Sequence, residues 1–215
     1  MIDYDAFIKE ALERYDVRGV LHLGACAPCM QLSIYSANKI PQIVLVEGNP
    51  ELVESFSQHH PILPPGCQLI STVISDIDDK KIPFRLIYSK DMANKGCSSL
   101  FKSSSSSCFN NFFEKEVLQL ETMTVDTMLQ RNGIQPTAIN LLVMDIQGAE
   151  LLALRGATKL LPNLDAIVTE VSWDALYEEQ ALVHEIDDFL NEHGFVREKT
   201  MKCHDTWGES LYVKK

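Results

Sequence analysis

The sequence predicts an α/β fold, in which helices cover both faces of a mostly parallel sheet, and three observations carry this prediction. Strand-like and helix-like segments alternate along nearly all of the 215 residues, which is the order of a doubly wound sheet. The run Leu141–Met144 is continuously apolar, as in a strand that is covered on both sides. Two strand-like segments at 194–202 and 209–215 close the chain and should pair as a hairpin around Trp207 and Gly208.

The first half of the chain contains elements that we assign from periodicity and flanking residues. Apolar residues from Tyr4 to Tyr15 recur at helical spacing, and Asn49-Pro50 puts a proline in the first turn of a helix. The predicted order is a helix at about 3–15, a strand at 19–24, a helix from the late twenties to 38, a strand at 42–47, a helix at 49–60 and a β-rich segment at 68–75.

The second half follows the same alternation after a polar, serine-rich segment at 89–111. An apolar stripe that includes Leu182, Ile186 and Phe189 predicts the last helix. The predicted order is a strand at 83–88, a β-rich segment at 117–125, a short helix ending near 133, a strand at 141–144, a helix after 148, a strand at 165–171 and a helix at about 179–193.

Length, charge and cysteine usage restrict the class of protein. No linker divides the chain, so a single domain over 1–215 is expected. The formal net charge of −11 disfavours a nucleic-acid partner. No apolar run is long enough to cross a membrane, and the acidic N-terminus is not a secretory signal. The cysteines are scattered, and the one CxxC, Cys26 to Cys29, lacks further ligands for zinc, so a reducing, cytoplasmic location is expected.

Asp145 gives the strongest indication of a functional site. This carboxylate directly follows the buried strand 141–144, and Gln147-Gly148 then turns the chain into a helix. An ionised group at the end of a buried strand is costly unless a ligand or a partner uses it, and open α/β sheets bind ligands at the carboxyl ends of their strands. We therefore expect the active site here, with capping of the next helix as the alternative role for Asp145.

A second indication lies at the ends of the first two predicted strands. Gly24 follows the first strand and Glu47 ends the second, close to the ~20-residue separation at which an acid meets the ribose hydroxyls of a nucleotide. The dinucleotide fingerprint G-x-G-x-x-G is absent, since only Gly24 is a glycine there. A ligand with a ribose but no pyrophosphate, such as S-adenosylmethionine, fits better. A helix N-terminal charge is the alternative role for Glu47.

From about Val20 to its C-terminus the sequence resembles the FkbM-type S-adenosylmethionine-dependent methyltransferases. The matching segments are LHLGA, VLVEGNPEL, SSLF, TVDTML, INLLVMDIQGAELLALRGA, IVTEVSWDALY, IDDFLNEHGF and WGESLYVKK. The resemblance implies a class I methyltransferase Rossmann-like fold, seven-stranded with an antiparallel C-terminal strand, and O-methylation of a sugar or similar small-molecule hydroxyl. Pro28 departs from the glycine that is usual in this family.

The resemblance also implies where the cofactor binds. Ser75 and Asp76 fall where this fold contacts the adenine, although Asp76 also begins an acidic turn. The segment 89–111 falls where a lid would cover the cofactor, with a disordered loop as the alternative. The expected cofactor-binding residues are Gly24, Ala25, Glu47, Asn49, Ser75, Asp76, Ser99 and Asp145.

Methyl transfer to a hydroxyl needs a general base within hydrogen-bond reach, and the candidates are Asp145, Glu170 and Glu150. Glu150 could instead pair with Arg155. Asp145 and Glu170 could hold a divalent cation, which is not favoured because no third ligand can be named. His204, near Trp207, could border the acceptor pocket, with an exposed histidine of the turn as the alternative.

Two other classes of function remain open at this point. One is a non-catalytic Rossmann-like binding module, and the other is a nucleotide-cofactor oxidoreductase, which the missing glycines disfavour. The expected partner is a small-molecule or glycan hydroxyl acceptor, with no nucleic acid and no membrane. The sequence does not predict the oligomeric state.

Overall fold

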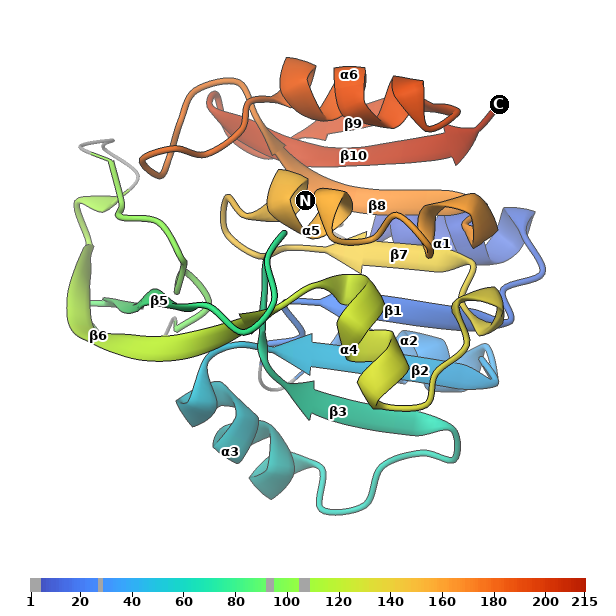
Figure 1. Ribbon diagram of the computed structural model, residues 1–215, viewed down its shortest axis with the longest axis horizontal. Coiled ribbons are helices and arrows are strands. Elements are labelled where there is room, and N and C mark those ends of the chain that lie inside the picture. The colour runs from blue at the N-terminus through green and yellow to red at the C-terminus, as the bar shows by residue number, and fades with distance from the viewer. Residues whose placement is uncertain (1–4, 27–28, 92–94, 105–108) are drawn as a thin grey trace.

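A seven-stranded sheet in the order β3-β2-β1-β7-β8-β10-β9 forms the centre of the protein (Figure 1). The computed structural model describes residues 5–26, 29–91, 95–104 and 109–215. The strands from β3 to β8 in this order pair in parallel, and β10 is antiparallel to both of its neighbours. The predicted class I methyltransferase topology is therefore confirmed. The strands are β1 Gly19–Leu23, β2 Gln42–Glu47, β3 Cys67–Ser71, β7 Leu141–Met144, β8 Ala166–Ser172, β9 Phe195–Lys202 and β10 Trp207–Lys214.

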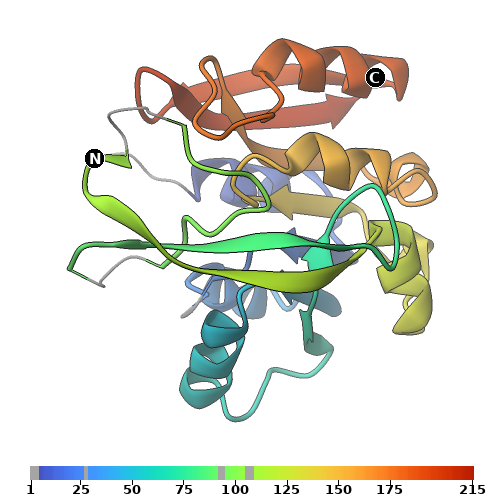
Figure 2. The same ribbon diagram turned by 60° about the vertical axis from the view of Figure 1, so that its left-hand side comes forward.

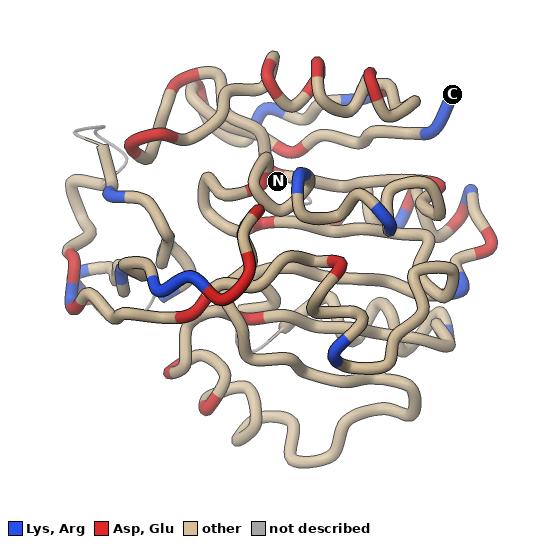
Figure 3. Tube along the Cα trace, viewed as in Figure 1, with Lys and Arg blue, Asp and Glu red and all other residues tan. Residues whose placement is uncertain are grey.

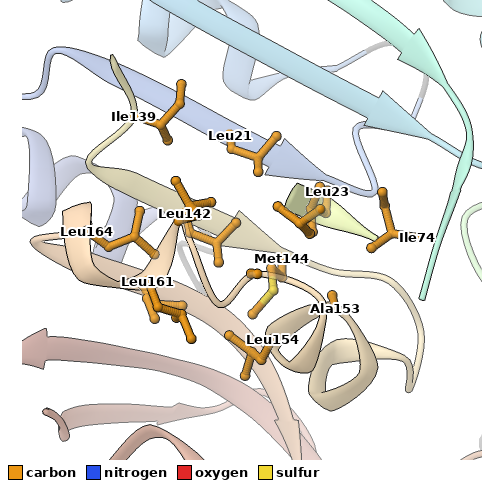
Figure 4. Close-up of a cluster of buried hydrophobic side chains, with 14 of the residues drawn as sticks. Leu21, Leu23, Ile74, Ile139, Leu142, Met144, Ala153, Leu154, Leu161 and Leu164 are labelled. Carbon is orange, nitrogen blue, oxygen red and sulfur yellow. The ribbon is translucent and has the colours of Figure 1, made fainter. Parts of the chain in front are cut away.

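Helices cover both faces of this sheet, because successive side chains of each buried strand point to opposite faces. In β1, Val20 packs in a cluster with residues of α1, α2 and α3, whereas Leu21 and Leu23 pack with residues of α4, α5 and α6. Figure 4 shows part of the second cluster, where Leu23 and Met144 lie near Leu154. The helices are α1 Ala6–Arg14, α2 Gln31–Ala37, α3 Pro50–His59, α4 Val125–Arg131, α5 Glu150–Arg155 and α6 Val183–Glu192.

A second sheet of three strands, in the order β4-β6-β5, was not expected. Its strands are β4 Val73–Ile74, β5 Lys81–Ser89 and β6 Phe112–Met123. The β-rich segment predicted at 68–75 breaks at Thr72, so that β3 pairs with β2 while β4 pairs with β6. The β5–β6 hairpin crosses the carboxyl ends of the central strands (Figures 1 and 2). It therefore forms a side wall where the site was predicted.

The boundaries of two predicted helices differ from the structure. The first helix begins at Ala6, and residues 3 and 4 of the predicted segment 3–15 lie outside the described residues. The last begins at Val183 rather than near 179, because Gln180 anchors the preceding loop: its Oε1 accepts hydrogen bonds from the backbone N–H groups of Leu176 and Tyr177. Among the helices in the described ranges, none is both long and apolar enough to span a bilayer.

Candidate active site

The loops after β1, β2 and β7 meet at the carboxyl edge of the central sheet and line one cavity. Backbone bonds fix them, since the N–H of Gly24 donates to Val46 (2.9 Å) and that of Asp145 donates to Leu23 (3.0 Å). The cavity has about 610 Å³ of empty space out to its mouth, and we call it the first cavity. Its polar and backbone lining includes Gly24, Glu47, Gly48, Lys95, Gly96, Ser98, Asp145 and Gln147, and its apolar lining includes Leu23, Val46, Leu52, Val73, Ile74 and Phe84.

Gly24 occupies a position where a side chain has no room. Its φ is +83°, and a Cβ there would lie 1.8 Å from the carbonyl oxygen of Asp145. The close approach of the loop after β7 therefore requires a glycine here. The same residue still lines the first cavity.

Glu47 joins the loops after β1 and β2. Its carboxylate accepts hydrogen bonds from the backbone N–H groups of Cys26 (3.0 Å) and Asn49 (2.7 Å). The side chain is buried, and burial raises the pKa of the carboxyl while these backbone donors oppose the rise. Glu47 therefore supports the cavity wall and also faces the cavity.

The segment 95–100 forms a wall that is hydrogen-bonded on both sides. Asn49 caps α3 through its Oδ1, and its Nδ2 donates to Oγ of Ser98 (3.2 Å). Oγ of Ser99 donates to the backbone oxygen of Gln147 (2.6 Å). Asn49 and Ser99 therefore hold this wall in place and do not line the first cavity. The predicted lid at 89–111 is described except for residues 92–94 and 105–108.

A second cavity of about 1040 Å³, counted out to its mouth, lies on the other side of this wall. Gly96, Asp145 and Gln147 line both cavities, so the two meet at these residues. His204 lies in its lining and is an exposed residue of the turn between β9 and β10. The full lining is Gly96, Cys97, Phe109, Phe112, Asp145, Gln147, Glu170, Leu176, Tyr177, His204 and Trp207.

Two carboxylates, Asp145 and Glu170, face the second cavity. The carboxyl of Asp145 is surrounded by protein atoms, and this burial raises its pKa. A hydrogen bond from Nε2 of Gln147 opposes the rise. The side chain is still accessible to solvent through the cavities. Burial, followed by repulsion from Asp145, raises the pKa of Glu170 well above its ordinary value. Within the described part of the chain, no group donates a hydrogen bond to the carboxylate of Glu170, whereas its backbone oxygen accepts one from Oγ1 of Thr169 (3.1 Å).

Glu150 lies apart from the linings of both cavities. Its Oε1 accepts hydrogen bonds from the backbone N–H groups of Ile146 (2.9 Å) and Gly148 (3.3 Å), so it closes the turn that follows Asp145. Burial raises its pKa to about 7. The alternative ion pair with Arg155 is not formed in the described residues.

The remaining predicted cofactor residues, Ala25, Ser75 and Asp76, lie in two different places. Ala25 is buried in the core beside α1 and α2. Ser75 and Asp76 line a separate cavity together with Arg85. The residues just before them, Thr72 and the two residues of β4, line the first cavity. Pro28 lies outside the described residues.

Sequence reasoning missed Tyr177, and it treated Gln147 only as part of a turn. Tyr177 falls in the segment IVTEVSWDALY, but nothing in its spacing indicates a contact with Gln147. His22 is a buried residue of β1, with Nδ1 3.1 Å from the Tyr35 hydroxyl. Within the described ranges, no three His, Cys, Asp or Glu side chains cluster so that they could hold a metal ion.

Comparison with known proteins agrees with this architecture. A family model described as the methyltransferase FkbM domain matches residues 24–197, and no curated protein matches the chain. Similar solved structures include a candidate RNA methyltransferase from Pyrococcus horikoshii (TM-score 0.52, 12% identity, covering 98% of this chain and 82% of that one). A second is a precorrin-6y C5,15-methyltransferase from Geobacter metallireducens (TM-score 0.51, 11% identity, 97% and 86%).

A third similar structure is a candidate tRNA (m1A22) methyltransferase from Streptococcus pneumoniae in complex with S-adenosyl-L-methionine (TM-score 0.51, 9% identity, 100% and 73%). At these identities the likeness to the three structures concerns the fold alone. The family match covers most of the chain. The chain therefore belongs to the FkbM methyltransferase family and is an S-adenosylmethionine-dependent methyltransferase.

Proposed function

We propose that the protein methylates a hydroxyl group of a sugar, as a glycan or glycoside, or of a similar small molecule. The observation that carries this proposal is the junction of the two cavities at Asp145, Gln147 and Gly96. In this proposal the first cavity holds the cofactor and the second holds the acceptor, so the methyl group passes where they meet.

Two features of the first cavity support its assignment to S-adenosylmethionine. The absence of a side chain at Gly48 leaves room along its wall, because a Cβ there would come within 3.3 Å of Phe84 and Val73, which line the cavity. Backbone N–H groups occupy part of the acceptor capacity of the Glu47 carboxylate, which has about four lone-pair sites, so it can accept a further hydrogen bond. We assign this carboxylate to the ribose hydroxyls of the cofactor.

The bound cofactor supplies an activated methyl group on its sulfonium. The protein then has to hold the acceptor oxygen in place and remove its proton. We assign these tasks to Asp145 and Glu170, because both carboxylates face the second cavity. Asp145 lies at the junction and is the first choice for the base, and Glu170 would bind a neighbouring hydroxyl. Glu150 is a positioning residue in this scheme, since its carboxylate holds the turn after Asp145.

The chemistry of the second cavity favours a polyhydroxylated acceptor. Carboxylates accept hydrogen bonds from sugar hydroxyls, and Phe109, Phe112, Tyr177 and Trp207 supply apolar surface for a sugar ring. In the described lining there is no Lys or Arg to bind a phosphate. With the net charge of −11, this disfavours a nucleic-acid acceptor.

Calorimetry with S-adenosylmethionine and S-adenosylhomocysteine tests the first cavity. We expect binding, and weaker binding by Glu47→Gln. A panel of glycosides, assayed by the release of S-adenosylhomocysteine with and without a chelator, tests the second. Binding of cofactor without turnover on any hydroxyl acceptor would favour the non-catalytic module, and methylation of an amine or of RNA would overturn the proposed acceptor class.

A further inference from the structure

Gln147 connects the two cavities by a short chain of hydrogen bonds. The hydroxyl of Tyr177 donates to Oε1 of Gln147 over 2.6 Å and also lies 3.0 Å from the carbonyl oxygen of Cys97. Nε2 of Gln147 in turn donates to Oδ1 of Asp145. With the carbonyl of Gln147 held by Tyr177, its amino group is directed at the carboxylate.

The backbone of Gln147 supports a role for its side chain. Its φ is +54°, in the left-handed region that favours glycine, and Gly148 follows with a φ of +98°. A non-glycine residue in this region carries backbone strain, and such strain concentrates at functional sites. Glycine would adopt this backbone conformation with less strain. We therefore look for the role of residue 147 in its side chain, which forms hydrogen bonds that glycine could not form.

We propose that Gln147 is a positioning residue for methyl transfer: its side-chain amide, oriented by Tyr177, fixes the carboxylate of Asp145 at the junction of the two cavities. This inference rests on the proposed catalytic role of Asp145. Gln147 lines both cavities, so the carboxylate that it holds faces the cofactor side and the acceptor side together.

The surroundings of Asp145 make this amide important, because the titratable groups around it are mostly acids. Repulsion links Asp145 with carboxylates on four elements, and thiol and phenol groups lie nearby. Lys95, which lines the first cavity, lies 4.0 Å from Glu51. Among the described residues, Gln147 supplies the side-chain hydrogen bond that stabilises the ionised form of Asp145. The other surrounding groups are Glu47, Glu150, Glu170, Glu209, Cys97, Cys203, Tyr177 and His204.

Tyr177 is well placed to keep Gln147 in one orientation. The side chain is fully buried, and its ring meets that of Phe109 edge-on at 5.1 Å between centroids. A Cβ at Gly148 would lie 3.2 Å from the ring of Tyr177, so this glycine lets the tyrosine approach the turn. The Tyr177 hydroxyl binds the side-chain oxygen of Gln147, so the amino group of the amide faces Asp145. Removal of this hydroxyl would remove the preference for that orientation.

The test observes the Asp145 carboxyl directly by 13C NMR of aspartate-labelled protein at neutral pH, with and without S-adenosylhomocysteine. The resonance is assigned by its loss in Asp145→Asn. We expect Gln147→Met, which has similar size but no donor, to move this resonance toward the protonated position. Tyr177→Phe should move it in the same direction by less. Tyr35→Phe is the matched control, since it removes another buried hydroxyl, which contacts His22, and should leave the Asp145 resonance unchanged.

A second variant separates positioning from folding. Gln147→Gly relieves the left-handed backbone, so its Tm should equal or exceed that of the parent protein, while turnover on an acceptor found by the glycoside panel falls by at least ~100-fold. An unmoved Asp145 resonance in Gln147→Met, or full turnover by Gln147→Gly, would overturn the inference. S-adenosylhomocysteine binding that persists in either case would leave the proposed function standing, whereas its absence in the parent protein would remove the proposed function itself.

Discussion

Gly24 shows how closely the loops after β1 and β7 approach each other. Replacement by alanine combines an unfavourable φ with a Cβ that would lie 1.8 Å from the Asp145 carbonyl oxygen. We expect Gly24→Ala to lower the free energy of unfolding by more than ~3 kcal/mol, because the backbone has to shift as well as strain. Thermal and urea unfolding measure this.

Gly133 provides the matched control, since its φ is +68° but a Cβ at this position would meet no atom within 4 Å. Gly133→Ala should therefore cost only the conformational strain, about 1 kcal/mol. Equal losses for the two variants would mean that the contact with Asp145 is relieved without cost.

Asp145 allows a test of the proposed base. Asp145→Asn keeps the size of the side chain and removes its ability to take up a proton. We expect the variant to fold and to bind S-adenosylhomocysteine, while kcat on a glycoside acceptor falls by ~100-fold or more. Near-normal turnover would remove Asp145 from the catalytic residues.

The individual site residues differ in how far the sequence could place them. Gly24, Glu47 and Asp145 follow strands whose carboxyl ends meet at one edge, so strand order alone brings them together. The contact between Tyr177 and Gln147 joins residues 30 positions apart across two irregular loops. No periodicity or spacing encodes such a contact, so it required the structure.

At the level of elements, the N-terminus of α3 carries both a cap and a wall contact. Asn49→Ala removes the bond to the backbone N–H of Glu51 and the bond to Ser98. We expect a loss of about 1 kcal/mol in stability, together with weaker binding of S-adenosylhomocysteine, because the wall of the first cavity loses an anchor. Unfolding and calorimetry measure the two effects.

Thr124 caps α4 in the same way, through a hydrogen bond to Thr127, and it lines neither cavity. Thr124→Ala should lower stability by a similar amount and leave cofactor affinity unchanged. If both variants changed affinity equally, the contact between Asn49 and Ser98 would have no separate part in binding.

The same scale shows why the second sheet was missed. The strand character of 83–88 and 117–125 was recognised from the sequence, and both segments lie in strands of the structure, except that β6 ends at Met123 and Val125 already begins α4. β5 and β6 pair with each other in antiparallel orientation, and β6 also pairs with β4 in parallel orientation. Hydrophobic patterning identifies a strand but not the sheet that it joins, because neighbouring strands are selected by tertiary packing.

At the scale of the whole molecule, the buried carboxylates set the pH dependence of stability. Burial raises the pKa of Glu150 to about 7 and that of Glu209 to about 8. The native state therefore retains protons that the unfolded chain has lost, so the free energy of unfolding should fall as the pH rises from about 5 to 8. Each retained proton contributes a slope of about 1.4 kcal/mol per pH unit. Burial lowers the pKa of His22 to about 4, which opposes this trend below its unfolded pKa of about 6.5.

Denaturant unfolding at several pH values measures this slope. Glu209→Gln should flatten it and stabilise the protein at pH values near 8. Glu116→Gln, on the exposed surface of β6, serves as the control and should leave the profile unchanged. Stability that rises between pH 6 and pH 8 would contradict the prediction.

Acidic residues also follow one another along the outer side of α6 (Figure 3).

The two cavities have different origins in the chain. The first is built largely on the ends of β1, β2 and β7, whereas the second takes Phe109 and Leu176 from segments between strands and helices, and Trp207 from the start of β10. Under the proposed function, substitutions in these segments would remodel the pocket that we assign to the acceptor and leave the strands beneath the proposed cofactor cavity unchanged. A new range of acceptors could then arise while the proposed methyl-donor site stays the same.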